Sequence, residues 1–318
     1  ERSRLPVSPG ALRAGTLRCS LAGSDMASLF ARAGLCTLAL LSLAPFRAIA
    51  DAAADVETWV RLKGDAAGAV TYEWVTGTAW GIPLDDVSRP LFQIESVTLR
   101  QITRFGPAHY VEQSYACRLY RDAATGEYIS RFINPFTRLE VTLGTRCSPG
   151  PSIRYTPERV SLVASIPFES SALNAPMQLT RIDIGEHVTL RREAHSQYRS
   201  QSSGELRRET SLDTFVVPAR DLANPRLTSL DAAYQWTSVT QWMAELAMGE
   251  RPGRMLWSIN GRKFAKATDL PPAFRAALER AVPGALEHRF TSVACEGCPE
   301  ALSPCRGSTD DCRGSPRR

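Results

Sequence analysis

Residues 120–143 read YRDAATGEYISRFINPFTRLEVTL, and this stretch decides the fold class. Its pattern predicts three short strands joined by two turns. Gly126 stands where a hairpin loop requires a positive φ. Asn134-Pro135 ends the middle strand of residues 128–133, because proline has no N–H to donate to a β-ladder. The next strand is expected from Arg138, so the stretch has the pattern of an antiparallel β-meander.

Alternating apolar and polar residues extend this pattern in both directions. Further strands are expected at residues 70–80, 91–103, 108–122, 179–199, 205–217 and 255–260, with a turn at Asn260-Gly261. Helices are expected only near the two ends, at residues 51–63 and 271–280. No expected strand is followed by a helical pattern, which disfavours a parallel α/β fold. We therefore expect a mainly β protein: a single antiparallel sheet curved into an up-and-down barrel of the calycin or lipocalin type, with short N- and C-terminal helices.

Composition divides the chain into four expected parts. They are an upstream or disordered extension (residues 1–25), a signal peptide (26–50), a single β-rich domain (51–290) and a disordered tail rich in cysteine, arginine and serine (291–318). After Met26 an arginine, a short apolar run, Pro45 and a small-residue site ending at Ala50 are typical of secretory signal peptides. The run is too short to span a membrane. We expect a periplasmic or secreted protein, cleaved near Ala50, with no stable membrane insertion after cleavage.

Little of the net charge of +5 belongs to the β-rich domain. Residues 51–290 carry 28 basic and 27 acidic side chains. A nucleic-acid-binding domain would have a clear basic excess or a basic patch. The composition of the β-rich domain therefore predicts no nucleic-acid partner.

Eight cysteines fall into separate groups. Cys117 and Cys147 lie in the β-rich domain, where they form either one disulfide or two free buried thiols. Four more crowd the tail, at Cys295, Cys298, Cys305 and Cys312. Their spacing is superficially zinc-like but lacks a second CxxC or a histidine pair, so no metal site is predicted. The domain has neither a glycine-rich phosphate loop nor a GxSxG nucleophile elbow, and we expect no cofactor.

A series of short motifs runs through the β-rich domain in a defined order. They are Trp59–Leu62, Tyr120–Asp122, Thr125–Glu127, Asn134-Pro135 with Thr137, Met248–Gly253, Gly261–Lys263 and Leu270-Pro271. Their order and spacing over residues 56–286 resemble an uncharacterised bacterial family, domain of unknown function 1838. The resemblance implies one domain and carries no assigned activity.

Two histidine–carboxylate pairs are candidates for acid–base chemistry. Glu193 and His195 are two residues apart on an expected strand and therefore share a face. The alternative is an ordinary solvated strand face. His109 and Glu112 are three residues apart, so they would meet only across a β-bulge.

Aromatic side chains at alternate positions are candidates for a pocket wall. Tyr72, Trp74 and Trp80 share one face of an expected strand, and Trp242 and Trp257 follow later. Such a stripe either lines an apolar cavity or belongs to the core.

Two arginines are candidates for orienting the polar end of a ligand. Arg191 lies on an arm of the expected hairpin, where it would face either solvent or, inside a barrel, an anionic ligand. Arg251 lies in the Met248–Gly253 motif, which also has the pattern of a helix stop.

Three functions remain open at this level. The first is a β-barrel that binds a small, partly apolar ligand. The second is a periplasmic hydrolase or isomerase that uses a His/Glu pair on the same scaffold. The third is a structural or interaction protein of the cell envelope.

Overall fold

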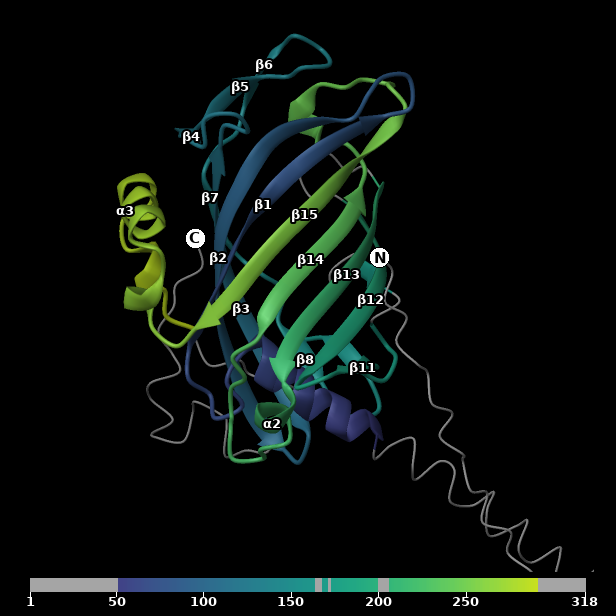
Figure 1. Ribbon diagram of the computed structural model, residues 1–318, viewed down its shortest axis with the longest axis vertical. Coiled ribbons are helices and arrows are strands. Elements are labelled where there is room, and N and C mark those ends of the chain that lie inside the picture. The colour runs from purple at the N-terminus through teal and green to yellow at the C-terminus, as the bar shows by residue number, and fades with distance from the viewer. Residues whose placement is uncertain (1–50, 164–167, 171–172, 200–205, 291–318) are drawn as a thin grey trace, which may run out of the picture. The chain divides into compact units, whose positions relative to one another are not determined.

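The alternating stretches of the sequence form one large antiparallel sheet (Figure 1). The computed structural model describes residues 51–163, 168–170, 173–199 and 206–290. The expected N-terminal extension, the signal peptide and the tail with its four cysteines lie outside these ranges.

The large sheet contains 13 strands. They are β1 (Thr71–Pro83), β2 (Arg89–Gly106), β3 (His109–Arg121), β4 (Tyr128–Ile129), β7 (Arg146–Pro149), β8 (Ile153–Tyr155), β9 (Val160–Leu162), β10 (Phe168–Ser170), β11 (Thr180–Ile184), β12 (His187–Arg199), β13 (Leu206–Pro218), β14 (Ala233–Thr240) and β15 (Gly253–Phe264). A separate two-stranded sheet pairs β5 (Arg131–Ile133) with β6 (Glu140–Thr142).

Helices are few and short. Residues 51–63 are helical, followed by α2 (Ala219–Leu222), α3 (Pro272–Ala281) and the 3-10 turns η1 (Ala244–Leu246), η2 (Ala267–Asp269) and η3 (Ala285–Glu287). None of the helices in the described part of the chain has the length and apolar character that crossing a membrane requires.

The strand order is β10-β12-β13-β14-β15-β1-β2-β3-β8-β9, with β11 also on β12 and with β4 and β7 also on β3. Strands β1 and β15 pair from Tyr72 and Phe264 to Pro83 and Gly253. The first and the last strand of the large sheet in chain order are therefore neighbours. Among the described residues no ladder connects β9 to β10. The mainly β class, the single large antiparallel sheet and the scarcity of helices are confirmed, whereas closure into a barrel stays a prediction.

Three local expectations were wrong. The middle strand of the meander is divided at Ser130, because β4 pairs with β3 and β5 pairs with β6. The expected strand at residues 179–199 is two strands that turn at Gly185, whose φ is 59°. Asn260-Gly261 makes no turn and lies inside β15. A Cβ on Gly261 would be 2.6 Å from the Trp74 carbonyl oxygen, so this glycine serves the close approach of β1.

Each face of the sheet is covered by different elements. On one face α3 packs on β2 and β3 through Phe274 and Leu278, which are fully buried. On the other face the helix of residues 51–63 covers one end of the sheet, where Trp59 packs against Phe215. The connection from β14 to β15 covers the other end through Leu246. The second face therefore has two apolar clusters, and the site described below lies between them.

A disulfide joins β3 to the short strand β7. Cys117 and Cys147 are directly opposite in the β3–β7 ladder and are bonded to each other. The bond closes a loop with a sequence separation of 30 residues. Because β7 has only four residues, the disulfide is a major part of its attachment to the sheet.

Replacing both cysteines by alanine is expected to lower the free energy of unfolding by about 3–4 kcal/mol, because the unfolded chain regains the entropy of an open loop. Urea denaturation followed by circular dichroism measures this change. The wild-type protein in excess reductant is the control and should shift in the same direction. Equal unfolding midpoints for variant and wild type would contradict the assignment.

Candidate functional site

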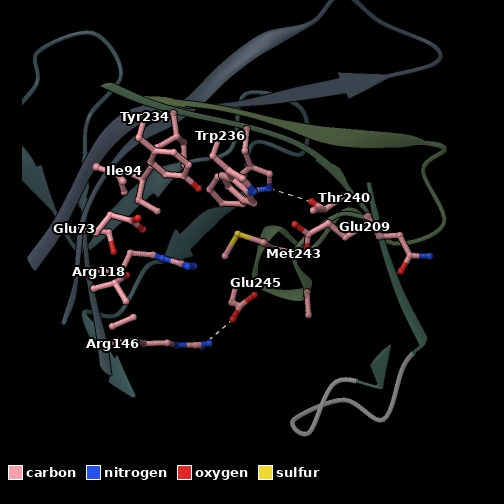
Figure 2. Close-up of a pocket in the computed structure, with 18 of the residues that line it drawn as sticks. Glu73, Ile94, Arg118, Arg146, Glu209, Tyr234, Trp236, Thr240, Met243 and Glu245 are labelled. Atoms are coloured by element: carbon pink, nitrogen blue, oxygen red, sulfur yellow. Dashed lines mark hydrogen bonds and ion pairs between the residues drawn. The ribbon is translucent and has the colours of Figure 1, made fainter. Parts of the chain in front are cut away.

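A pocket of about 400 Å³ opens on the sheet face between the two apolar clusters (Figure 2). Side chains from β1, β2, β3, β7, β13, β14 and β15 line it, together with residues of the connection that follows β14. Val75 and Trp236 contact both clusters and also line the pocket, which places the pocket between them. Its volume is in the range of small-molecule sites.

One wall of the pocket is apolar. It consists of Val75, Ile94, Trp236, Met243, Trp257 and Ile259. Trp257 donates its indole N–H to Thr240 Oγ1 at 3.0 Å, so its polar atom is satisfied within the wall. The ring centroids of Trp236 and Trp257 are 6.4 Å apart. The wall therefore offers rigid aromatic surface to an apolar group.

Arginines supply the positive charge of the pocket. Arg118 on β3 points into it (Figure 2) and makes no hydrogen bond or ion pair with another described residue. Arg146 on β7 also lines the pocket, and its Nη2 is 2.8 Å from Glu245 Oε1. Arg208 on β13 is a third lining arginine and donates from Nε to Gln197 Oε1 at 3.3 Å.

Glu209 on β13 places a carboxyl group in the same pocket. Ser238 Oγ donates a hydrogen bond to Glu209 Oε1 at 2.8 Å. Burial raises the pKa of Glu209 and Asp213 adds to this increase, whereas Ser238 and Arg118 oppose it. A fraction of this carboxyl is therefore protonated at a higher pH than an exposed glutamate would be.

Buried charges form the floor of the pocket. Glu73 lines the pocket and accepts hydrogen bonds from Lys63 Nζ at 2.8 Å and from Arg100 Nη2 at 3.0 Å. Arg100 also pairs with Glu112, which accepts a hydrogen bond from Tyr155 OH at 2.8 Å. Burial alone would raise the pKa of Glu73, but Lys63 and Arg100 lower it to about 2. Opposite charges thus alternate from the helix of residues 51–63 to Glu112 on β3, which Tyr155 of β8 hydrogen-bonds.

Lys263 adds a further polar contact between β15 and the same helix. Its Nζ donates to the carbonyl oxygens of Arg61 and Gly64 at 2.6 Å each. Burial lowers the pKa of Lys263 to about 7, although Glu73 and Asp65 oppose the shift. Lys263 therefore holds the end of the helix against the sheet.

The aromatic residues predicted for the pocket lie elsewhere. Tyr72 and Trp74 pack in the apolar cluster beneath α3, on the opposite face of β1 from the pocket residues Glu73 and Val75. Trp74 donates its indole N–H to Glu95 Oε1 at 3.0 Å. Trp80 is not among the residues that line the pocket, whereas Trp257 is.

Trp242 and Arg251 belong to the contact between the β1–β2 loop and the Asn134-Pro135 turn. Trp242 donates its indole N–H to the Arg251 carbonyl oxygen at 2.9 Å. Arg251 pairs through Nε with Asp85 Oδ1 at 2.9 Å and lies over the Phe136 ring. A Cβ on Gly253 would be 2.5 Å from Trp242, which explains the last glycine of the Met248–Gly253 motif. These residues fix the loops at one end of the sheet and do not line the pocket.

The predicted acid–base pairs lie outside the pocket as well. Glu193 Oε1 is 3.3 Å from His195 Nε2, but both side chains are largely exposed on β12. His109 and Glu112 are not in contact: His109 Nε2 is 4.0 Å from Glu158 Oε2, and Glu112 is buried in the floor network.

Arg191, predicted to bind a ligand, also lies outside the pocket. It is exposed on β12, opposite Thr180 and Thr214.

The sequence reasoning missed most of the pocket residues, among them Glu73, Arg118 and Glu209. Glu73 lies between Tyr72 and Trp74 in the chain, so strand alternation predicts that it faces away from these aromatic residues. Arg118 follows Cys117 directly and must therefore face away from the disulfide. No local pattern distinguishes Glu209 from the neighbouring charges of β13. Across the described residues no group of three or more His, Cys, Asp or Glu side chains could hold a metal ion.

Residues 68–290 match the model of a family described as protein of unknown function, DUF1838. The chain belongs to this family. Searches among curated proteins and among solved structures give no match. The matched region of the DUF1838 domain contains every residue that lines the pocket. It begins after the helix of residues 51–63, whose Lys63 completes the pocket floor.

Replacing Glu73 by glutamine is expected to destabilise the protein by about 3–5 kcal/mol, because Lys63 and Arg100 stay buried without their shared carboxylate. The pKa of Glu73 is lower in the folded state (about 2) than its ordinary value of 4.5. Its contribution to stability is therefore present above pH 4.5 and is lost as the pH falls toward 2. Urea denaturation at several pH values measures both effects.

Glu127→Gln is the matched control, because Glu127 is exposed and its carboxylate makes no hydrogen bond or ion pair with another described residue. The control should unfold like the wild type. A Glu73→Gln variant with wild-type stability at neutral pH would show that the floor network contributes little.

Proposed function

We propose that the protein binds a small amphipathic molecule in the pocket between its two apolar clusters. The apolar body of the ligand lies against Trp236, Trp257 and Ile259, and its carboxylate pairs with Arg118. The observation that carries this proposal is Arg118, a guanidinium group that lines the pocket and has no ion-pair partner among the described residues.

The charges around the pocket support an anionic ligand. The Glu73 carboxylate is occupied by Lys63 and Arg100, and the Glu245 carboxylate is occupied by Arg146. Among the lining arginines, Arg118 and Arg208 make no ion pair with a described carboxylate, and Arg208 is bonded to the neutral Gln197. A guanidinium group offers two parallel N–H donors, which match the two oxygens of a carboxylate.

Export is part of the same proposal. Disulfides persist in oxidising compartments and are rare in the cytosol, so the Cys117–Cys147 bond supports a periplasmic or secreted location. The signal-peptide pattern of residues 26–50 supports it independently. A calycin-like barrel is also proposed, supported by long antiparallel strands in one sheet with the pocket on one face.

One observation favours an enzyme as a second candidate. Glu209 is a mostly buried carboxyl group that lines the pocket, and its pKa is raised by burial. Such a group can donate a proton to a bound substrate and take it back, as a hydrolase or isomerase requires. Glu209 therefore takes the place of the exposed Glu193 and His195 in the enzymatic hypothesis.

Octanoate is expected to bind the wild-type protein and octanol to bind much more weakly, because only octanoate can pair with Arg118. Arg118→Gln should weaken octanoate binding by about ten- to a hundredfold, the worth of a charge-assisted hydrogen bond. Titration followed by tryptophan fluorescence measures binding, since Trp236 and Trp257 lie in the pocket wall. A Trp257→Phe variant assigns the signal to the wall.

Arg220→Gln is the matched control. Arg220 is on α2, its side chain is 87% exposed and it does not line the pocket. Its replacement should leave octanoate binding unchanged. Equal affinity for octanoate and octanol, or equal affinity of the wild type and Arg118→Gln, would overturn the proposal. Native mass spectrometry of the protein exported into a periplasm would identify a ligand that stays bound.

A further inference from the structure

Two arginines face each other across neighbouring strands at the pocket. Arg118 on β3 and Arg146 on β7 are direct partners in the β3–β7 ladder, and both line the pocket. Directly opposed side chains in an antiparallel pair have Cβ atoms about 4.5–5.5 Å apart, and like charges there destabilise the pairing. The adjacent rung of the ladder is the Cys117–Cys147 disulfide, which keeps the two strands together despite this repulsion.

Only one of the two arginines forms an ion pair with a described carboxylate. Glu245 lines the pocket from the connection between β14 and β15, and its Oε1 is 2.8 Å from Arg146 Nη2 (Figure 2). Arg118 has no such partner among the described residues. The opposed pair thus carries two positive charges, and Glu245 is the one described carboxylate that makes an ion pair with it.

The segment that carries Glu245 is fixed independently of Arg146. The next residue, Leu246, is fully buried, and its carbonyl oxygen accepts a hydrogen bond from Asn134 Nδ2 at 2.7 Å. Asn134 is itself fully buried. Glu245 can therefore leave Arg146 by rotating its own side chain, while the backbone of η1 stays in place. The ion pair is also partly exposed, with the Arg146 side chain 70% and the Glu245 side chain 32% exposed, so breaking it costs little.

We propose that Arg118 and Arg146 form one oxyanion site and that Glu245 is its internal competitor. The carboxylate of an entering ligand binds both guanidinium groups and displaces Glu245 from Arg146. This inference rests on the proposed function, and it adds a second binding residue and a residue that weakens binding. Neutral ligands therefore leave the ion pair between Glu245 and Arg146 intact, whereas oxyanions take the place of Glu245.

The test is a double-mutant cycle on octanoate affinity, measured by tryptophan fluorescence with the full chain and its disulfide intact. Glu245→Gln keeps the shape of the side chain and removes the competing charge, so octanoate should bind about two- to fivefold more tightly. Arg146→Gln should bind octanoate more weakly than the wild type. In the double variant the gain from Glu245→Gln should disappear, because its partner is missing.

Glu250→Gln is the matched control, since Glu250 is exposed on the same connection and does not line the pocket. It should leave the affinity unchanged. The competing role of Glu245 is refuted if Glu245→Gln binds octanoate as tightly as the wild type or more weakly, while Arg118→Gln still binds it more weakly than the wild type. The proposed function would then remain supported. If Arg118→Gln binds octanoate like the wild type, the proposed function itself fails. The two results are distinguishable within one set of titrations.

Discussion

The buried carboxylate of Glu73 is the interaction on which the rest of the pocket depends. It lies between Lys63 of the N-terminal helix and Arg100 of β2, with ion-pair distances of 2.8 and 3.0 Å. A charge this deeply buried is tolerated only when it is fully paired, so helix, β1 and β2 must meet in one arrangement. That arrangement leaves a polar floor beneath the pocket where an apolar core would otherwise fill the space.

The pocket exists because the apolar material of this sheet face is divided. One cluster gathers around Trp59 and Phe215, and the other gathers around Phe92 and Leu246. Between them the strands present small or charged side chains, such as Ser96. Packed apolar side chains would have closed this gap, whereas a charged floor and a rim of arginines keep it accessible to solvent.

The disulfide and the opposed arginines are linked through their positions in the same ladder. Cys117 and Cys147 point to one face, so Arg118 and Arg146 must point to the other. A covalent bond holds together a pairing that electrostatic repulsion would weaken. A strand of four residues can thus present a guanidinium group at the pocket without a large apolar contact of its own.

The sequence by itself determined the fold class, because alternation and turn residues are local properties: Gly126, Pro135 and the helix of residues 271–280 all signal within a few positions. It also determined which residues share a face, and Glu193 with His195 follows this rule. Only the tertiary structure decided which face is which. Tyr72 and Trp74 lie beneath α3, and Glu73 lies at the pocket. Which face of β1 becomes the pocket face depends on where α3 and the N-terminal helix pack. The sequence also does not predict that Glu73 pairs with Arg100 or that Arg118 lies opposite Arg146. These contacts depend on the register between strands far apart in the chain, which leaves no local pattern.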